Sequence, residues 1–270
     1  MQPLKIGTRE SELAVWQAMQ VRSLLQQNSI DSELIFINSE GDIDLVTPLY
    51  EMGVQGIFTK TLDAALLNKR IDIAVHSMKD VPTQLPQGIR QAAVLKRGSY
   101  KDLLVFKDIS LVDSWQLTVD CINSPLGDGG IIATSSIRRK AQWLHRYPNH
   151  TIENLRGNIN TRLQKLKDSN WDAAIFAAAG LERINLRPQN SVELDWMLPA
   201  PAQGAIMVVC RAEDENTFNV CQAFNDNLTE LCTKIERDFL RELLGGCSTP
   251  ISALAEAADD KILFKGNICS

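Results

Sequence analysis

The order of its predicted strands and helices is the feature that most limits the fold of this chain. Short segments of β pattern alternate with amphipathic helical segments from residue 5 to residue 177. This alternation is typical of parallel sheets that carry helices on both faces. The sequence therefore predicts an α/β protein.

The same order of elements occurs twice. The first set has strands at 5–8, 33–37 and 71–75 and helices at 13–27 and 59–68. The second set has strands at 130–133, 151–155 and 171–177 and helices from 137 and over 160–167. GTRES at 7–11 corresponds to ATSSI at 133–137, and RIDIAV at 70–75 to NWDAAI at 170–175. We therefore predict two lobes of repeated architecture that face each other across a cleft.

A third unit follows the lobes. Residues 205–211 are expected to form a strand that returns to the first lobe, residues 216–244 a helix, and 252–256 and 261–266 two strands. Crossings between the lobes are expected near 95–101 and 198–203. We thus expect lobe 1 over 1–97 and 200–222, lobe 2 over 98–199, and a third domain over 223–270.

Composition narrows the class of protein. The chain has 270 residues and a net charge of −5, which argues against a general nucleic-acid binder. No apolar run approaches the roughly 20 residues that span a bilayer. Six cysteines without a CxxC pair and three scattered histidines argue against a zinc site. Without a visible leader peptide we expect a cytoplasmic protein with reduced thiols.

One segment places a cation and a carboxylate together at the end of a strand. The strand at 71–75 leads to Lys79 and Asp80, and Pro82 prevents easy continuation. Open α/β sheets bind ligands at the carboxyl ends of their strands. We interpret Asp80 as the chemical centre, with an ordinary surface turn as the alternative.

Arginines give the second signal, because they follow strands or open helices in both lobes. Cations at a helix start are unfavourable unless an anion is present, and guanidinium groups suit carboxylates or phosphates. No GxxxxGK[ST] motif occurs. The alternative to an anion site is that these arginines are simply solvated. The hydroxyl groups of Ser11 and of residues 134–136 could belong to the same anion site, and an equally good interpretation is that they cap helices. The arginines are Arg9, Arg138, Arg139, Arg156 and Arg162.

Cys247 gives the third signal, because it lies in the loop LLGGCSTP. A thiol in such a loop can be a nucleophile, an attachment point or neither. No histidine lies nearby in the sequence to activate it, which weakens the interpretation as a cysteine hydrolase.

Several motifs together resemble the porphobilinogen deaminase (hydroxymethylbilane synthase) family over essentially the whole chain. They are VHSMKDVP at 75–82, TSSIRR at 134–139, LRGNINTRL at 155–163, AAAGLER at 177–183, PAQGA at 201–205 and LLGGCSTPI at 243–251. The resemblance implies two lobes like those of type II periplasmic binding proteins, a central cleft and a small third α/β domain. It also implies a transferase of tetrapyrrole and heme biosynthesis that condenses four porphobilinogen molecules head to tail, releasing ammonia, to give hydroxymethylbilane.

The resemblance further implies roles for single residues. Asp80 would be the catalytic carboxylate, and a dipyrromethane cofactor would be bound to Cys247 by a thioether. The cofactor contacts would be Lys79, Ser11, Thr134, Ser135, Arg138, Arg139 and Arg162. The substrate contacts would be Arg9, Arg156, Arg183 and Gln203. We expect a monomer that acts on a small molecule, without a metal, a nucleic acid or a membrane as partner.

Two departures from the family pattern qualify these expectations. Glu51 and Gln55 stand where the family often has lysines in a KxGGKGLF loop, so no lysine contact is assigned there. The family also continues for some tens of residues beyond the equivalent of Ser270, so the third domain is expected to be incomplete. The alternative function is a non-catalytic, two-lobed binding protein for a small anion, which needs neither Asp80 nor a loop thiol.

Overall fold

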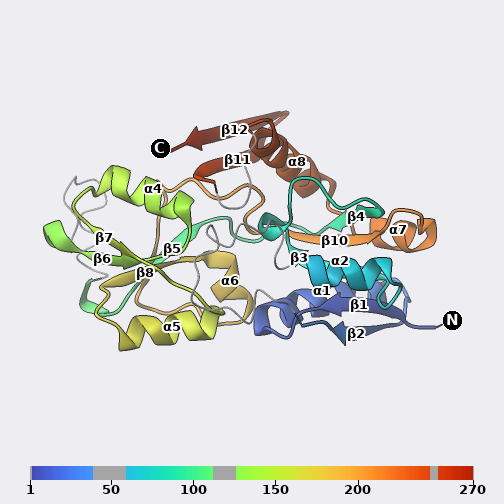
Figure 1. Ribbon diagram of the computed structural model, residues 1–270. Helices are drawn as coiled ribbons and strands as arrows, with labels where there is room; N and C mark the ends of the chain where they lie inside the picture. The colour runs from blue at the N-terminus through green and yellow to red at the C-terminus, as the bar shows by residue number, and fades with distance from the viewer. Residues whose placement is uncertain (1, 39–58, 112–125, 244–248, 270) are drawn as a thin grey trace.

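The computed structural model describes residues 2–38, 59–111, 126–243 and 249–269 (Figure 1). Within these ranges the chain forms two five-stranded sheets and one two-stranded sheet. Figure 1 shows the first two sheets side by side, with the third unit lying along one edge of both. The predicted fold class, α/β with two lobes and a smaller third unit, is confirmed.

The first sheet has the strand order β2-β1-β3-β10-β4. Strands β1 and β2 pair in parallel, β1 and β3 pair in parallel, and β10 runs antiparallel to both β3 and β4. The strands are β1 (Leu4–Thr8), β2 (Ser32–Phe36), β3 (Ile73–Ser77), β4 (Ile89–Val94) and β10 (Ile206–Arg211). The predicted return of a strand near residue 205 to the first lobe is confirmed.

The second sheet repeats this arrangement with the order β7-β6-β8-β5-β9. Here β6 pairs in parallel with β7 and β8, while β5 runs antiparallel to β8 and β9. The strands are β5 (Asp102–Phe106), β6 (Ile131–Ala133), β7 (Thr151–Glu153), β8 (Ala173–Ala177) and β9 (Ser191–Glu193). The two sheets therefore share one topology, as the repeated sequence pattern predicted.

The expectation of purely parallel sheets is wrong, because each sheet is mixed. Strands β3 and β8 end at the edge where the lobes face each other. A strand that arrives from the other lobe enters its sheet at that same edge and must run in the opposite direction. Both β5 and β10 follow a crossing between the lobes, and both are antiparallel to their neighbours.

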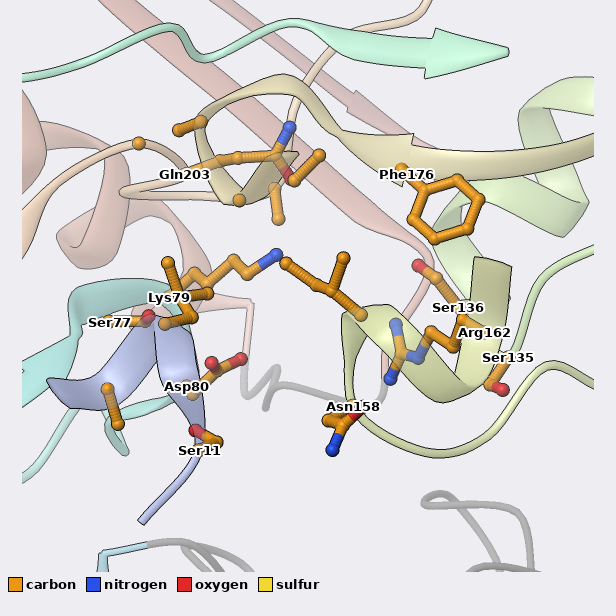
Figure 2. Close-up of a pocket in the computed structure, with 18 of the residues that line it drawn as sticks. Ser11, Ser77, Lys79, Asp80, Ser135, Ser136, Asn158, Arg162, Phe176 and Gln203 are labelled. Carbon is orange, nitrogen blue, oxygen red and sulfur yellow. The ribbon is translucent and has the colours of Figure 1, made fainter. Parts of the chain in front are cut away.

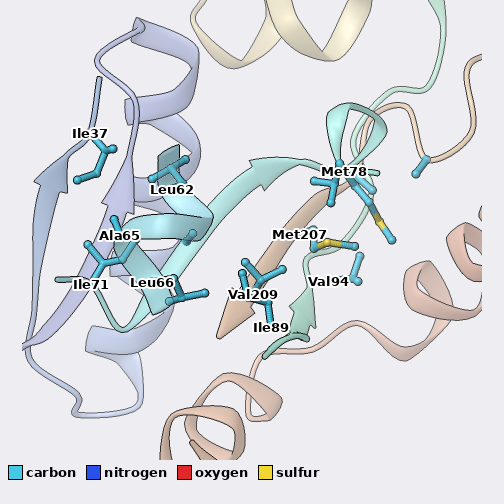
Figure 3. Packing of buried hydrophobic residues seen from close by; sticks show 14 residues of the cluster. Ile37, Leu62, Ala65, Leu66, Ile71, Met78, Ile89, Val94, Met207 and Val209 are labelled. Atoms are coloured by element: carbon cyan, nitrogen blue, oxygen red, sulfur yellow. The ribbon is translucent and has the colours of Figure 1, made fainter. Parts of the chain in front are cut away.

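Apolar side chains cover both faces of the first sheet. On one face, α2 (Lys60–Leu67) contributes Leu62 and Leu66 to a buried cluster that also contains Ala74 and Met207. Figure 3 shows Leu62, Leu66 and Met207 of this cluster. On the other face, α1 (Glu12–Gln27) and α7 (Glu215–Gln222) cover Ile73 and Val75. Burial on both faces explains why residues 73–75 of β3 are all apolar.

Among the described residues, three helices cover the second sheet in the same manner. Trp143 of α4 (Ile137–Arg146) is fully buried in one cluster, and α5 (Ile159–Asp168) and α6 (Ala178–Arg183) contribute Leu166 and Leu181 to another. The predicted helices at 137 and 160–167 are confirmed.

The third unit consists of α8 (Asn227–Glu242), β11 (Ile251–Ala258) and β12 (Lys261–Ile268). The two predicted strands are confirmed, but the single predicted helix over 216–244 is wrong. The chain leaves the helix after α7 and starts again at α8, where the Asp226 side chain accepts a hydrogen bond from the Thr229 amide. This N-cap separates α7, which packs on lobe 1, from α8, which packs on β11.

The two crossings between the lobes contact each other closely. The Gly98 amide donates to the Gly204 carbonyl at 3.0 Å, and Arg97 Nε donates to the Gln203 carbonyl at 2.8 Å. Gly204 has φ of +87°, and a Cβ atom there would lie 2.6 Å from the Ser99 carbonyl oxygen. Only glycine fits this crossing without strain.

In the part of the chain that the structure describes, no helix is long and apolar enough to cross a membrane. The same residues contain no cluster of three or more His, Cys, Asp or Glu side chains that could hold a metal ion.

Candidate active site

A cleft of about 350 Å³ lies between the two lobes. Residues from the ends of β3 and β8, from the loops after β1, β6 and β7, and from the crossing at 200–205 line it. Figure 2 shows Lys79 and Asp80 on one side, Arg162 and Ser135 on the other, and Gln203 beside the crossing. The structure thus brings the predicted carboxylate and predicted arginines to one cavity.

The turn that carries Lys79 and Asp80 is a 3-10 helix, η2 (Met78–Asp80), which continues directly from β3. Met78 anchors the turn, because its side chain is 2% exposed in the lobe 1 core and its amide donates to the Ala205 carbonyl at 3.0 Å. Its neighbour Ser77 is fixed by a hydrogen bond of 2.9 Å from Gln17 Nε2 of α1. A buried core residue therefore forces the next two side chains into the cleft.

The third unit holds the same turn from behind. Arg237 of α8 donates to the main-chain carbonyls of Met78 at 3.2 Å, Val81 at 2.9 Å and Pro82 at 2.6 Å. The Met78 carbonyl also accepts from the Val81 amide at 3.2 Å, and the one buried guanidinium adds a donor to all three carbonyls. Lobe 1 and the third unit therefore hold the turn that carries Asp80.

Two groups on this side of the cleft have perturbed pKa values. Burial lowers the pKa of Lys79 to about 8, although Asp80 beside it acts in the opposite sense. Burial also lowers the pKa of His76 to about 4, and the nearby charge of Arg9 adds to this effect. The imidazole of His76 is therefore neutral at ordinary pH, and its Nε2 atom has no hydrogen-bond partner among the described residues.

Basic side chains form the opposite wall. Arg162 of α5 donates from Nε to the Gly157 carbonyl at 2.7 Å, and its guanidinium faces the cleft in Figure 2. Burial lowers the pKa of Arg162 to about 10, with Arg139 acting in the same direction, so it stays charged. Arg156 is buried on the same wall, and Arg9 lines the cleft from lobe 1. This wall can bind anionic groups.

Arg138 and Arg139 lie in the first turn of α4 as predicted, but they are buried and share a counter-ion. Arg138 Nη2 lies 2.8 Å from Asp102 Oδ2, and Arg139 Nη2 lies 2.7 Å from Asp102 Oδ1. Arg138 Nη1 also donates to the Leu198 carbonyl at 2.7 Å, and Arg139 Nη1 to the Ile175 carbonyl at 2.9 Å. The sequence reasoning missed this carboxylate.

The hydroxyl groups near the cleft are largely held by main-chain groups. Ser136 caps α4 by accepting from the Arg139 amide, Thr134 Oγ1 accepts from the Ser136 amide, and the Ser135 hydroxyl bonds to the Leu155 main chain. Ser11 is the N-cap residue of α1 but makes no side-chain capping bond, and it lines the cleft. The cap alternative therefore holds for Ser136 and not for Ser11.

Arg183 and Gln203, two predicted substrate contacts, form hydrogen bonds with main-chain carbonyls of the crossings between the lobes. Arg183 Nη2 donates to the Gly204 carbonyl at 2.6 Å, and Gln203 Nε2 donates to the Tyr100 carbonyl at 2.7 Å and to Asp102 Oδ1 at 2.9 Å. Both side chains line the cleft, so they connect its walls to the crossing. The predicted roles of Cys247, Glu51 and Gln55 lie outside the described residues.

The fold and cleft define a class: a two-lobed α/β protein whose cleft sets a carboxylate against basic side chains. Among solved structures, an ancestral cationic amino acid solute binding protein aligns with a TM-score of 0.48 and 12% identity over 89% of this chain and 90% of that one. The fold is therefore defined by the strand order of its own sheets and not by this likeness.

Sequence comparisons identify the family. Residues 4–219 match the model described as porphobilinogen deaminase, dipyromethane cofactor binding domain, and residues 230–270 match its C-terminal domain. A probable porphobilinogen deaminase of Methanocaldococcus jannaschii is 42% identical over 97% of this chain and 86% of its own length. Porphobilinogen deaminases of Brevibacillus brevis (40%; 95% and 81%) and Acidithiobacillus ferrooxidans (38%; 99% and 85%) are similar as well. The chain belongs to the porphobilinogen deaminase family.

Family membership fixes the activity. The chain is a transferase of tetrapyrrole biosynthesis that condenses four porphobilinogen molecules head to tail into hydroxymethylbilane, with release of ammonia and with a dipyrromethane cofactor. This result favours the enzyme over the non-catalytic anion-binding protein. Both the cofactor and the substrate carry carboxylates, and the cleft offers charged donors that match them, together with the buried Arg138 Nε, which has no partner among the described residues.

Proposed function

We propose that Asp80 is the catalytic carboxylate of this reaction and that the basic wall opposite binds the carboxylates of the cofactor and substrate. The observation that carries this proposal is the shared cleft, in which Asp80 and Arg162 line one cavity from different lobes. A protein with a net charge of −5 concentrates cations there, as a substrate with two carboxylates requires.

Asp80 has a defined chemical task in this proposal. Loss of the amine from porphobilinogen leaves positive charge on the substrate, and a fixed carboxylate stabilises that charge as it develops. The carboxylate can also accept the proton released when the new carbon–carbon bond is complete. The turn that holds Asp80 is anchored by Met78 and Arg237, so little reorganisation accompanies the step.

The other side chains bind and orient. We assign cofactor contacts to Lys79, Ser11, Thr134, Ser135, Arg138, Arg139 and Arg162, and substrate contacts to Arg9, Arg156, Arg183 and Gln203. All of these line the cleft. The dipyrromethane, when bound, supplies the electron-rich pyrrole on which the product is built.

Cys247 is proposed as the attachment point of the cofactor through a thioether. Intact-mass spectrometry of the purified protein tests this proposal. The expected mass exceeds that of the chain by two pyrrole units, and Cys247→Ser loses the increment. Cys269→Ser, which changes the partly buried thiol directly after β12, serves as the control and keeps the increment. An unmodified wild-type protein with full activity would remove the thioether from the proposal.

The wider setting is proposed as follows. The enzyme is a cytoplasmic monomer that acts on a small molecule, without a nucleic-acid or membrane partner. Its domains are lobe 1 (1–97 and 200–222), lobe 2 (98–199) and the third domain (223–270), which agrees with the separate sheets and with the packing of α7 on β4 and β10. Light scattering after gel filtration should give about 30 kDa, and a dimer mass would contradict the monomer.

A further inference from the structure

A fully buried carboxylate lies behind the cleft. Asp102, the first residue of β5, is 0% exposed and is not part of the cleft lining. Its Oδ2 atom accepts from Arg138, and its Oδ1 atom accepts from Arg139 Nε at 3.1 Å, Arg139 Nη2 at 2.7 Å and Gln203 Nε2 at 2.9 Å. All three partners line the cleft, so Asp102 connects them from behind.

The first lobe has an apolar residue at the position that corresponds to Asp102. Asp102 is the antiparallel partner of Ala177, the last residue of β8. The corresponding partner of Ser77, the last residue of β3, is Ile206. A strand entering from a crossing therefore accommodates an apolar residue here, and the fold does not require a carboxylate.

The carboxylate of Asp102 can stay ionised in the interior because Arg138 and Arg139 lie against it. Burial by itself raises the pKa of Asp102, but the charges of Arg138 and Arg139 outweigh it and hold the pKa well below the ordinary range. Asp102 is thus ionised together with two guanidinium groups, and the buried trio carries one net positive charge. A buried carboxylate with only one oxygen satisfied would be strongly unfavourable, whereas here both oxygens accept charged donors.

We infer that Asp102 is a positioning residue of the anion site: it fixes the orientation of Arg138 and Arg139 and cancels one of their two charges. This inference rests on the proposed function of the two arginines. Arg139 uses Nε and both terminal nitrogens in internal bonds, whereas Arg138 Nε is buried without a partner among the described residues. Asp102 therefore fixes the orientation of both guanidinium groups at the cleft, and Arg138 Nε remains as a donor for ligand.

The charge balance has a consequence for turnover. The product gains two carboxylates with each ring, and every such chain must finally leave the cleft. A buried wall with two uncompensated guanidinium groups would retain it more strongly than one with a single net charge. Asp102 therefore favours release as well as orientation.

The direct test is Asp102→Asn, which keeps the shape and removes the charge. We expect kcat to fall between roughly 10- and 100-fold, as for misplaced binding groups, while KM for porphobilinogen does not rise. The alkaline limb of the rate profile should move to lower pH, because Lys79, which faces Asp80, Asp102, Arg138 and Arg139, loses a neighbouring negative charge.

Asp72→Asn is the matched control. Asp72 also pairs with an arginine, Arg211 at 3.1 Å, and accepts from the Lys5 amide at 3.0 Å, but it lies at the start of β3, away from the cleft. This control should lower the melting temperature and leave kcat, KM and the pH profile unchanged. If Asp102→Asn behaves in the same way, Asp102 is only structural and the inference is overturned.

A second variant covers the case in which Asp102→Asn folds but is too unstable for kinetic measurements. Asp102→Asn combined with Arg138→Leu removes one charge of each sign, so it should melt at a higher temperature than Asp102→Asn alone and show a raised KM. A double variant no more stable than the single one would contradict the charge compensation. Wild-type kinetics of Arg138→Gln would instead overturn the proposed function of Arg138, so the two failures are distinguishable.

Discussion

The two lobes share one fold and differ in the charge that they bring to the cleft. Each has the same strand order, and in each an aspartate at the start of the third strand accepts from the first strand: Asp72 from the Lys5 amide and Asp172 from the Ile131 amide. At the other end of that strand, lobe 1 presents Asp80, whereas lobe 2 presents Arg183 on α6. The end of the strand that is alike in both lobes thus helps to build the sheet, and the end that differs supplies side chains to the cleft.

The largest effect should come from the lobe 1 side of this comparison. Asp80→Asn removes the charge that stabilises the cationic substrate, so kcat should fall by roughly 10²–10⁴-fold, with the melting temperature unchanged. Steady-state kinetics and thermal unfolding measure both quantities. Asp72→Asn, at the opposite end of the same strand, is the control and should retain wild-type kcat. Equal losses of kcat in Asp80→Asn and Asp72→Asn would contradict a catalytic role for Asp80.

The lobe 2 side should affect binding instead. Arg162→Gln removes a charged donor from the basic wall, which is worth about 1.5–3 kcal/mol and corresponds to a rise in KM of roughly 10- to 150-fold. Arg187→Gln removes a guanidinium that pairs with Glu182 and Glu193 outside the cleft, and its KM should stay at the wild-type value. If Arg162→Gln lowered kcat and left KM unchanged, the result would contradict the assignment of binding to lobe 2.

The pH dependence should follow Lys79. Because its pKa is about 8, the ammonium group loses its proton above that pH, and kcat/KM should decline there. Between about 8 and the ordinary value of 10.5 the unfolded chain binds a proton that the folded chain lacks, so the free energy of unfolding rises with pH over this window. Rate profiles and urea unfolding of wild type and Lys79→Met measure both effects, and both should vanish in the variant. An unchanged alkaline limb in Lys79→Met would assign that limb to another group.

The smallest effects should come from the features that the lobes share. Asp72→Ala and Asp172→Ala each leave a first-strand amide without its acceptor, which costs about 1–3 kcal/mol of unfolding free energy. Asp72 should give the larger loss, because it also pairs with Arg211. Urea unfolding measures this difference, and a change of KM in either variant would contradict a purely structural role.

Much of this comparison was predictable from the sequence. Local patterns located the repeated strands and helices, because alternation and amphipathic spacing depend on neighbouring residues. They also placed Lys79 and Asp80 at a strand end, which is confirmed because β3 ends at Ser77 and η2 follows it directly. The resemblance of six motifs to a family led to the activity that the comparisons confirm.

The remainder depends on contacts between distant segments. The sequence gives no local sign that Asp102 meets Arg138 and Arg139, because 36 and 37 residues separate them. The direction of β5 and β10 likewise follows from the crossings and not from their apolar patterns. The only sequence signal for Asp102 was a charged residue directly before LLVF, an apolar run that forms a buried strand.

The division of labour between the lobes is tested most directly by following the covalent chain by mass spectrometry after rapid mixing with porphobilinogen. Wild-type protein should show species enlarged by successive pyrrole rings. Arg162→Gln should form the same species, but only at higher porphobilinogen concentrations, whereas Asp80→Asn should form them at least roughly 10²-fold more slowly at every concentration. Addition of rings by Asp80→Asn at the wild-type rate would contradict the assignment of the chemistry to lobe 1.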